Sequence, residues 1–443
     1  MSLLEISRSM VEEGLKAGFN EAICKIVSSR TVMVKFSGEP TVTQSWIDTC
    51  IYLYLARDGR IVLCEYRTPD IERVKRRLVD LHESAKLIEA SPIYAPLPKP
   101  HKVKPLHLVD VKIVKLMDDR SDLIDYAWMM IDEASSEGAE NYAGALSASL
   151  SSKALTTSEG VELQEDSTGI ECYLRAFSGD GSGQWAYGGR RLDEYSIREV
   201  GRRAGMYAYL SKGTEPIEPG VYDLALSPMI VGNIVNVIGD MASALQVYLG
   251  LSFLLRFKPG DRVASENVCI EDDGISDNLP RSTGFDDEGI PTRVTTIISD
   301  GVFENLLHNS KTASKFNVES TGNAGWVKPE PWNLRFKPGD LKEDEIPSTL
   351  REGLILTNNW YTRLQSYVEG VFSTVARDAA FLVKDGRIVK AVRGLRITGS
   401  LHGLLSSVEY STDRYYQIKW WEVEVPVVAP YIIARRIYVS KPM

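Results

Sequence analysis

The spacing of apolar residues over the first 90 positions predicts a small unit of helices and strands. Leu4, Val11 and Leu15 fall on one face of an opening helix, and alternating apolar residues at 32–36 indicate a half-buried strand. The elements expected next are strands at 43–55 and 61–66, joined by the Asp58-Gly59 turn, and a helix at 71–88. Residues 1–90 are therefore predicted to form an α+β unit in the order helix, three strands, helix.

A proline-rich segment separates this unit from a second one with the same order. Five prolines lie between Pro92 and Pro105, which favours an extended linker over regular structure at 91–107. Beyond it, within 108–215, the expected elements are a helix at 123–134, strands near 143–152, 161–164 and 170–177, and a helix at 197–207. The two units share the order of their elements but little amino-acid sequence, so we infer an architectural duplication and not a sequence repeat.

The remaining residues, 216–443, are predicted to form a β-rich domain with a buried helix. Ser227-Pro228 is a strong helix start, since a hydroxyl residue precedes proline at the first helical position. Helical structure is expected to continue, with breaks, to Phe257. The segment 241–257 is short for a membrane span, which favours a buried helix there. Short strands and turns follow, including a hairpin at Asp385-Gly386. The predicted fold class is α+β.

Charge and cysteine content narrow the class of protein. With 51 basic and 60 acidic residues, the formal net charge of -9 would repel a phosphate backbone, which argues against nucleic acid as a ligand. The basic runs Lys75-Arg76-Arg77 and Arg202-Arg203 are interpreted as solvated helix faces. Five cysteines occur without a C-x-x-C pair, and the N-terminus has no signal-peptide pattern. We therefore expect a cytoplasmic protein that does not contact a membrane.

The most distinctive stretch of the chain runs from 282 to 325. It places three carboxylates beside a glycine at 285–289, then a strand at 294–298 and the tight turn Asp300-Gly301. The corner at 321–325 has glycines that let the backbone pass close to another chain or to a ligand. Such an arrangement is typical of a binding edge. The glycine-rich segment 178–183, in contrast, lacks the lysine and helix start of a phosphate loop and is interpreted as a flexible loop.

The order of these segments and the residues in them resemble the TldD/TldE (PmbA) family. Its members are called modulators of DNA gyrase and are known as two-subunit metallopeptidases. The matching segments, in family order, are FDDEG at 285–289, SDGV at 299–302, STGNAG at 320–325, and the stretches 384–399 and 430–441. Five separated matches in one order indicate membership, and the remaining question is which subunit this chain is.

The zinc motif of the family is missing. In TldD subunits, a His-Glu-x-x-x-His segment precedes a G-[DE]-x-V-A-S stretch, which is present here at 260–265. Counting back without gaps places Asn236 and Met241 at the histidine positions and Val237 at the glutamate position, and no histidine lies between His107 and His308. Asparagine is a poor zinc ligand, methionine suits softer ions, and valine transfers no proton. The resemblance therefore implies a TldE/PmbA-like subunit with no catalytic or metal-binding residue of its own.

On that reading, zinc belongs to a TldD-like partner subunit, and the pair would degrade unfolded peptides. This chain alone would be inactive, although it could form a homodimer without the partner. Peptides are expected to bind partly by adding a strand to an exposed sheet edge. Asp287 and Asn323 are the candidate peptide contacts.

Two alternatives remain open. His308 could approach Asp286, Asp287 or Glu288 and form a non-standard metal site, which would make the chain an autonomous metal-dependent hydrolase. The structural interpretation of His308 is a histidine at a strand end beside an exposed acidic turn, with no metal bound. The other alternative is a non-enzymatic binding protein of the gyrase-modulator type. His82-Glu83 does not begin a zincin motif, because Lys86 stands where the second histidine would be. His82 is interpreted as a surface histidine because it falls on the polar side of its predicted helix, and His402 and Cys269 are interpreted as structural.

Overall fold

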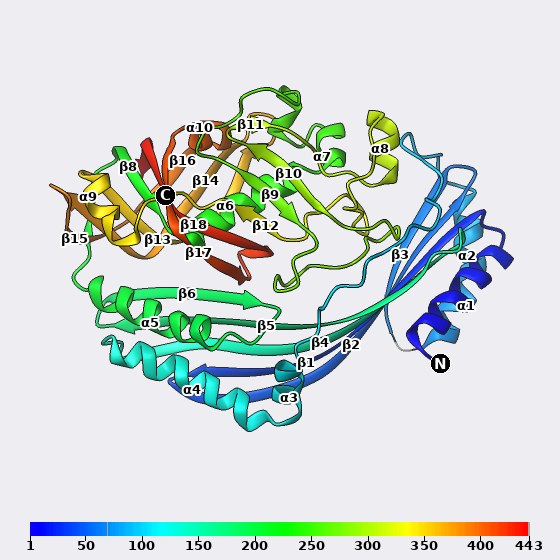
Figure 1. Cartoon of the computed structure of the whole chain (residues 1–443), viewed down its shortest axis with the longest axis horizontal. Coiled ribbons are helices and arrows are strands. Elements are labelled where there is room, and N and C mark those ends of the chain that lie inside the picture. Colours follow the sequence, from blue (N-terminus) through cyan, green and yellow to red (C-terminus); the bar gives the residue numbers. More distant parts are fainter. Residues whose placement is uncertain (69, 442–443) are drawn as a thin grey trace.

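The computed structural model describes residues 1–68 and 70–441, and its N-terminal half is built on one antiparallel sheet. The sheet has six strands in the order β3-β2-β1-β4-β5-β6. In chain order the strands are β1 (Glu21–Ser37), β2 (Glu39–Arg57), β3 (Arg60–Arg67), β4 (Asn141–Thr157), β5 (Glu162–Ser178) and β6 (Gly181–Gly189). The two predicted helix and strand units meet where β1 pairs with β4, with Thr31 opposite Ser149. One long curved sheet therefore runs through both units (Figure 1).

Helices cover the two ends of this sheet. At one end lie α1 (Leu3–Lys16) and α2 (Ile71–Ala85), and at the other lie α3 (Val111–Asp118), α4 (Arg120–Ser136) and α5 (Glu194–Leu210) (Figure 1). Ser2 and Glu5 form a capping box that starts α1, and Asp70 and Asp193 cap α2 and α5. Residues 98–110, within the proline-rich segment and just after it, contain no helix or strand.

The C-terminal region, residues 216–441, contains most of a second sheet of 12 strands, as the β-rich prediction requires. They are β7 (Glu215–Pro216), β8 (Gly220–Leu226), β9 (Ile270–Asp273), β10 (Val294–Ser299), β11 (Val302–Phe303), β12 (Leu334–Phe336), β13 (Gly353–Ser366), β14 (Val371–Lys384), β15 (Arg387–Arg393), β16 (Arg396–Ser400), β17 (Val408–Trp420) and β18 (Val423–Ser440). Short helices connect them: α7 (Ala244–Tyr248), α8 (Ser310–Phe316), α9 (Ile346–Leu350) and α10 (Leu401–Ser406). The fold class is α+β, as predicted.

The buried helix of this region is α6 (Pro228–Met241), which begins at the predicted Ser227-Pro228 signal. The Ser227 hydroxyl donates to the Thr357 carbonyl (2.5 Å) instead of capping the helix. The segment 241–257 is not the buried helix that was predicted. The helix α6 ends at Met241, and it is followed by the short helix α7 and by a 3-10 turn at Phe253–Arg256. Leu249 and Leu255 there are exposed. No helix within the described residues has the length and apolarity needed to span a membrane.

The three predicted Asp-Gly turns are confirmed. Asp58, Asp300 and Asp385 have φ values of 50°, 46° and 49°, and the glycines after them have 75°, 77° and 72°. A left-handed conformation at both central residues defines the type I′ turn, whose twist matches that of a β-hairpin. Aspartate tolerates this conformation better than most residues, and glycine adopts it without strain.

The glycine-rich segment is a hairpin and not a flexible loop, so this prediction was wrong. Ser178 pairs with Gly181 at the turn between β5 and β6, and the strand β6 was missed. A Cβ on Gly181 or Gly183 would lie 2.2 Å or 2.3 Å from the carbonyl oxygen of Ala208 or Ala204. The glycines therefore allow α5 to pack directly on β6, and this contact cannot be read from local sequence. The two short strands predicted at 161–164 and 170–177 are parts of one strand, β5.

Two side chains predicted to be exposed are buried. His82 is 8% exposed because it continues the buried stripe Val74, Leu78, Ala85 of α2, and it packs edge-on against Phe19 with the ring centroids 5.4 Å apart. Arg203 is 2% exposed and forms ion pairs with Glu199 (3.0 Å) and Glu343 (2.7 Å). A partner carboxylate distant in sequence makes its burial possible.

Candidate functional site

The helix α6 holds the positions where the family resemblance places zinc ligands. The Asn236 side-chain amide donates to the carbonyl oxygen of Val425 in β18 and accepts from its N–H at 3.5 Å. Val237 offers no ligand atom, and Met241 is 1% exposed in the core. A zinc site needs nitrogen, sulfur or carboxylate ligands directed at one point. The side chains present on α6 do not fit a zinc ion.

The structure does not bring His308 and the neighbouring carboxylates together as a metal-binding set. His308 Nδ1 lies 3.3 Å from the Thr312 hydroxyl, and burial lowers the pKa of His308 to about 4, so the ring is neutral at pH 7. Glu288 instead accepts from the Ser310 N–H (2.8 Å) and pairs with Lys311 (3.0 Å). Within residues 1–68 and 70–441, no group of three or more His, Cys, Asp or Glu side chains is arranged to hold a metal.

The acidic segment 285–289 is buried, contrary to the expected exposed turn. Asp286 is fully buried, and its carboxylate accepts from the N–H groups of Glu288 (2.9 Å), Ile290 (2.9 Å) and Ala324 (3.0 Å). Burial, followed by the nearby charge of Glu288, raises the pKa of Asp286 to about 8. This carboxyl therefore ties the segment to the 321–325 corner, where Gly322 (φ 71°) passes close to the backbone of Pro291.

Asp287 faces the six-stranded sheet. It is 8% exposed and forms an ion pair with Lys25 of β1, whose ammonium also lies 4.4 Å from the ring centroid of Tyr52. A second lysine from the sheet, Lys153, lies over the ring of Phe285 at 4.0 Å. Lysines on β1 and β4 thus hold the acidic segment against the sheet. Nothing in the local sequence around either lysine indicates this contact.

Asn323 lies deeper, and it is 1% exposed. Its amide nitrogen donates to Asp272 Oδ2 (2.6 Å) and to the Glu330 carbonyl (2.9 Å), while its Oδ1 has no hydrogen-bond partner among the described residues. Burial raises the pKa of Asp272 to about 7. The roles of Asp287 and Asn323 as peptide contacts stay predictions, and a peptide would reach either side chain only after a local rearrangement.

A cleft of about 420 Å³ lies where the C-terminal region faces the sheet. Part of its lining consists of small residues in register on three strands, since Thr31 pairs with Ser149 and Ser149 with Gly169. Other lining residues are Trp46 of β2, Arg281, Lys419 of β17 and Pro426 of β18. Hydroxyl groups at this surface can donate to and accept from a polar ligand. Reasoning from sequence missed this surface, because its residues lie far apart along the chain.

One edge of the sheet is partly open. β3 pairs with β2 only at Cys50–Arg57, whereas β1 pairs with β2 along nearly its whole length. The residues Val42 to Asp48 of β2 are consecutively exposed, including Trp46 (41%) and Ile47 (72%). An unpaired strand edge presents free N–H and C=O groups that can bind another strand.

Comparison with known proteins shows related chains. Residues 117–211 match the PmbA/TldA metallopeptidase central domain, and residues 219–441 match the PmbA/TldA metallopeptidase C-terminal domain. A metalloprotease of Methanothermobacter thermautotrophicus is 30% identical over 273 residues, which is 58% of this chain and 59% of that protein. The chain thus spans about three fifths of the metalloprotease relative's length. An uncharacterized protein of Methanocaldococcus jannaschii is 27% identical over 397 residues, 87% of this chain and 90% of that one.

Solved structures share the fold over nearly the whole chain. TldE from Thermococcus kodakarensis superposes with a TM-score of 0.83 at 18% identity, covering 98% of this chain and 100% of that one. A candidate modulator of a DNA gyrase from Thermotoga maritima superposes with a TM-score of 0.86 at 21% identity, covering 99% and 100%.

Proposed function

Because the chain belongs to the TldD/TldE (PmbA) family of metallopeptidases, we propose that it is the zinc-less, TldE/PmbA-like subunit of a TldD–TldE-type complex that degrades unfolded peptides. One observation supports the proposal: α6 carries Asn236, Val237 and Met241 at the positions where the family resemblance, counted without gaps, places the zinc ligands and the proton-transferring glutamate of a TldD subunit. Hydrolysis by zinc requires three protein ligands and an open position for water. A TldD-like partner would supply that site.

The contribution of this chain is to guide the peptide. The cleft with Thr31, Ser149 and Gly169 in its lining supports this role, because hydroxyl groups bind peptide backbones without demanding a particular side chain. The open edge of β2 at Val42 to Asp48 supports a second contact, in which an extended peptide adds a strand to the sheet. Both contacts tolerate varied sequences, as an enzyme acting on unfolded peptides requires.

We place the complex in the cytoplasm. Cys24, Cys50, Cys64, Cys172 and Cys269 are all unpaired, which is usual for proteins of a reducing compartment. Without its partner, the chain could associate with a second copy of itself.

Co-expression with a TldD-like chain tests the proposal. The two chains should purify as a stoichiometric complex that cleaves an unfolded peptide, while this chain alone should be inactive. A matched control is the complex in which the TldD-like chain carries alanines at its two zinc-binding histidines, which should assemble but not cleave. Cleavage by the isolated chain, or the absence of any complex, would contradict the proposal.

A further inference from the structure

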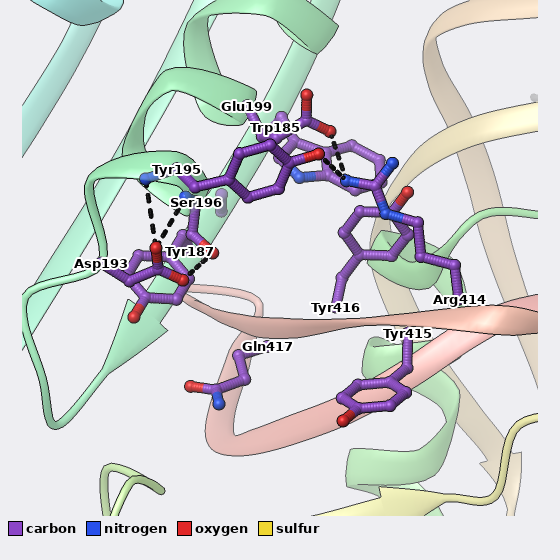
Figure 2. Close-up of a pocket in the computed structure, with 11 residues that line it drawn as sticks. Trp185, Tyr187, Asp193, Tyr195, Ser196, Glu199, Arg414, Tyr415, Tyr416 and Gln417 are labelled. Atoms are coloured by element: carbon purple, nitrogen blue, oxygen red, sulfur yellow. Dashed lines mark hydrogen bonds and ion pairs between the residues drawn. The ribbon is translucent and has the colours of Figure 1, made fainter.

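One of the arginines that lie where the N-terminal sheet meets the C-terminal region binds its neighbours in an unusual way. Figure 2 shows Arg414 of β17 donating to Glu199 of α5, and Arg203 pairs with the same glutamate. Arg190, directly after β6, is as buried as Arg203, at 2% exposed, but its guanidinium binds backbone carbonyl groups. Burial lowers the pKa of Arg190 to about 10, so the protein keeps a positive charge inside at pH 7.

The Arg190 guanidinium has five N–H groups, and each donates to a different backbone carbonyl. Three of these carbonyls lie in the loop that joins β9 to β10, one lies in β5, and one lies just after the proline-rich segment. The acceptors are the carbonyl oxygens of Leu279 (3.0 Å), Pro280 (2.5 Å), Ser282 (2.8 Å), Thr168 (3.1 Å) and Leu108 (3.4 Å). Arg190 therefore joins three segments that are distant in sequence.

A buried charge destabilises a fold unless hydrogen bonds or partner charges compensate for its lost hydration. At Arg190 the bonds to carbonyl oxygens supply this compensation, and the positive charge makes each of them stronger than a bond between neutral groups. No other side chain presents five donors in one plane. The consequence is that the loop 279–282 is fixed relative to β5.

The loop that Arg190 holds forms part of the cleft of about 420 Å³ described above. Pro280 and Arg281 of the loop line this cleft, and so do Thr168 and Gly189. Arg190 follows Gly189 in the chain, and its own donors bind the carbonyls of Thr168 and Pro280. Because Arg190 is almost completely buried, it lies behind the wall of the cleft.

Arg281 is the side chain whose position depends most on this arrangement. It lies between Pro280 and Ser282, whose carbonyls both bind Arg190, and its own backbone N–H donates to Asn333 Oδ1 (2.9 Å). Its side chain is 33% exposed, and the contact with the Glu330 carboxylate is long, at 3.5 Å. The Arg281 guanidinium can therefore donate to a carbonyl oxygen of a ligand in the cleft.

We propose that Arg190 is a positioning residue, which fixes the loop 279–282 so that Arg281 can donate to a backbone carbonyl of a peptide in the cleft. The inference rests on the function proposed above, because it takes the cleft to be a peptide site. It adds a role for a residue that does not itself touch the peptide, and it names the side chain through which that residue acts.

Fluorescence anisotropy with a fluorescein-labelled dodecapeptide of alanine, serine and leucine measures binding to the full chain. Arg281→Ala should weaken binding by about tenfold, because it removes a charged donor. Arg190→Lys keeps the charge but loses the planar set of five donors, and it should also weaken binding by about tenfold.

The double variant separates positioning from a general structural effect. If Arg190 acts through Arg281, adding Arg190→Lys to Arg281→Ala should weaken binding by less than about a further twofold. Losses that multiply in the double variant would overturn the proposal, because Arg190 would then act independently of Arg281. Unchanged binding in either single variant would overturn it as well.

Two further variants control for stability. Arg203→Lys changes an equally buried arginine away from the cleft, and it should lower the thermal midpoint without changing peptide binding. Equal weakening by Arg203→Lys and Arg190→Lys would assign the effect to general destabilisation and overturn the proposal. If Arg190→Lys does not fold, Ser282→Ala replaces it, since it removes only the bond from Asn333 Nδ2 to the Ser282 hydroxyl (3.1 Å) in the same loop. Ser282→Ala should weaken binding by about threefold, and unchanged binding would again overturn the proposal.

The same titrations distinguish this inference from the function on which it rests. Failure of the unmodified chain to bind the peptide at millimolar concentration would contradict the peptide-guiding role of the cleft, and the role of Arg190 would fall with it. Binding by the unmodified chain that Arg281→Ala leaves intact would overturn the role of Arg190 alone and leave the proposed function standing.

Discussion

The ion pair between Lys25 and Asp287 joins the N-terminal sheet to the acidic segment, and its removal offers a quantitative test of this architecture. The side chains are only 12% and 10% exposed, so neither charge is well solvated. In Lys25→Met, a side chain of similar length replaces the lysine, and the Asp287 carboxylate is left buried without its partner. The free energy of unfolding should then fall substantially.

The expected loss is about 3 to 5 kcal/mol, which is typical when one member of a buried ion pair is removed. Coulomb's law gives a similar magnitude, roughly 4 kcal/mol for unit charges about 4 Å apart at an effective dielectric constant of about 20. In the double variant Lys25→Met with Asp287→Asn, no charge remains buried. Its loss should therefore be smaller than the sum of the two single losses by at least about 2 kcal/mol.

Urea unfolding followed by tryptophan fluorescence measures these differences. Lys16→Met is the control, because Lys16 and Glu13 form an ion pair of 2.8 Å with side chains that are 68% and 39% exposed. Its loss should be at most about 1 kcal/mol. Single losses that add in the double variant, or a Lys25→Met loss no larger than that of Lys16→Met, would refute the reasoning that this pair joins the two parts of the protein.

Three further predictions concern pH, the open edge and one glycine. The pKa of Asp286 is raised from 3.8 to about 8, so its contribution to stability is present below about pH 4 and is lost as pH rises through about 8. The thermal midpoint should therefore fall between these pH values, and Asp286→Asn should make this fall smaller. In the register set by the 57–60 turn, the Ser45 N–H points to the open edge, so Ser45→Pro should leave the thermal midpoint nearly unchanged but weaken peptide binding. Gln44→Pro removes an N–H that pairs with β1 and should lower the thermal midpoint. Equal midpoints for the two variants would contradict this register. Gly183→Ala should lower the free energy of unfolding in urea by about 1 to 3 kcal/mol, because its Cβ would lie 2.3 Å from the Ala204 carbonyl oxygen. Gly399→Ala is the control and should be neutral, since nothing lies within 4 Å of the added Cβ. Similar losses in both variants would count against the packing of α5 on β6.

Local chemistry in the sequence was sufficient to place much of the fold. The alternation of apolar residues identified the strands of the first unit, and the three Asp-Gly pairs identified type I′ turns, because both signals depend on neighbouring residues alone. Ser227-Pro228 marked the start of α6 for the same reason, since proline is pre-organised for the first turn of a helix.

Features that depend on distant partners were missed. His82 and Arg203 look like surface residues in their helices, and only Phe19 and Glu343, far away in sequence, explain their burial. The strand β6 was missed because its glycines, which weaken any strand signal, are required by the close approach of α5.

The same limit applies to the candidate site. The sequence pointed to the segment around Asp287 and Asn323 but not to its burial, which depends on Lys25 of β1 and on Asp272. The cleft combines residues from more than three elements, and no local motif indicates it. The sequence did identify the unusual side chains on α6, because the comparison there is between residue types at fixed spacing.

The most direct test of the central claim is the zinc content of the isolated chain, purified without chelators and measured by elemental analysis beside a TldD-like chain prepared in the same way. The account predicts that the TldD-like chain retains zinc and that this chain retains none, because Asn236, Val237 and Met241 offer no ligand set. Zinc held at one ion per chain, and lost on substitution of Asn236 by alanine, would contradict it.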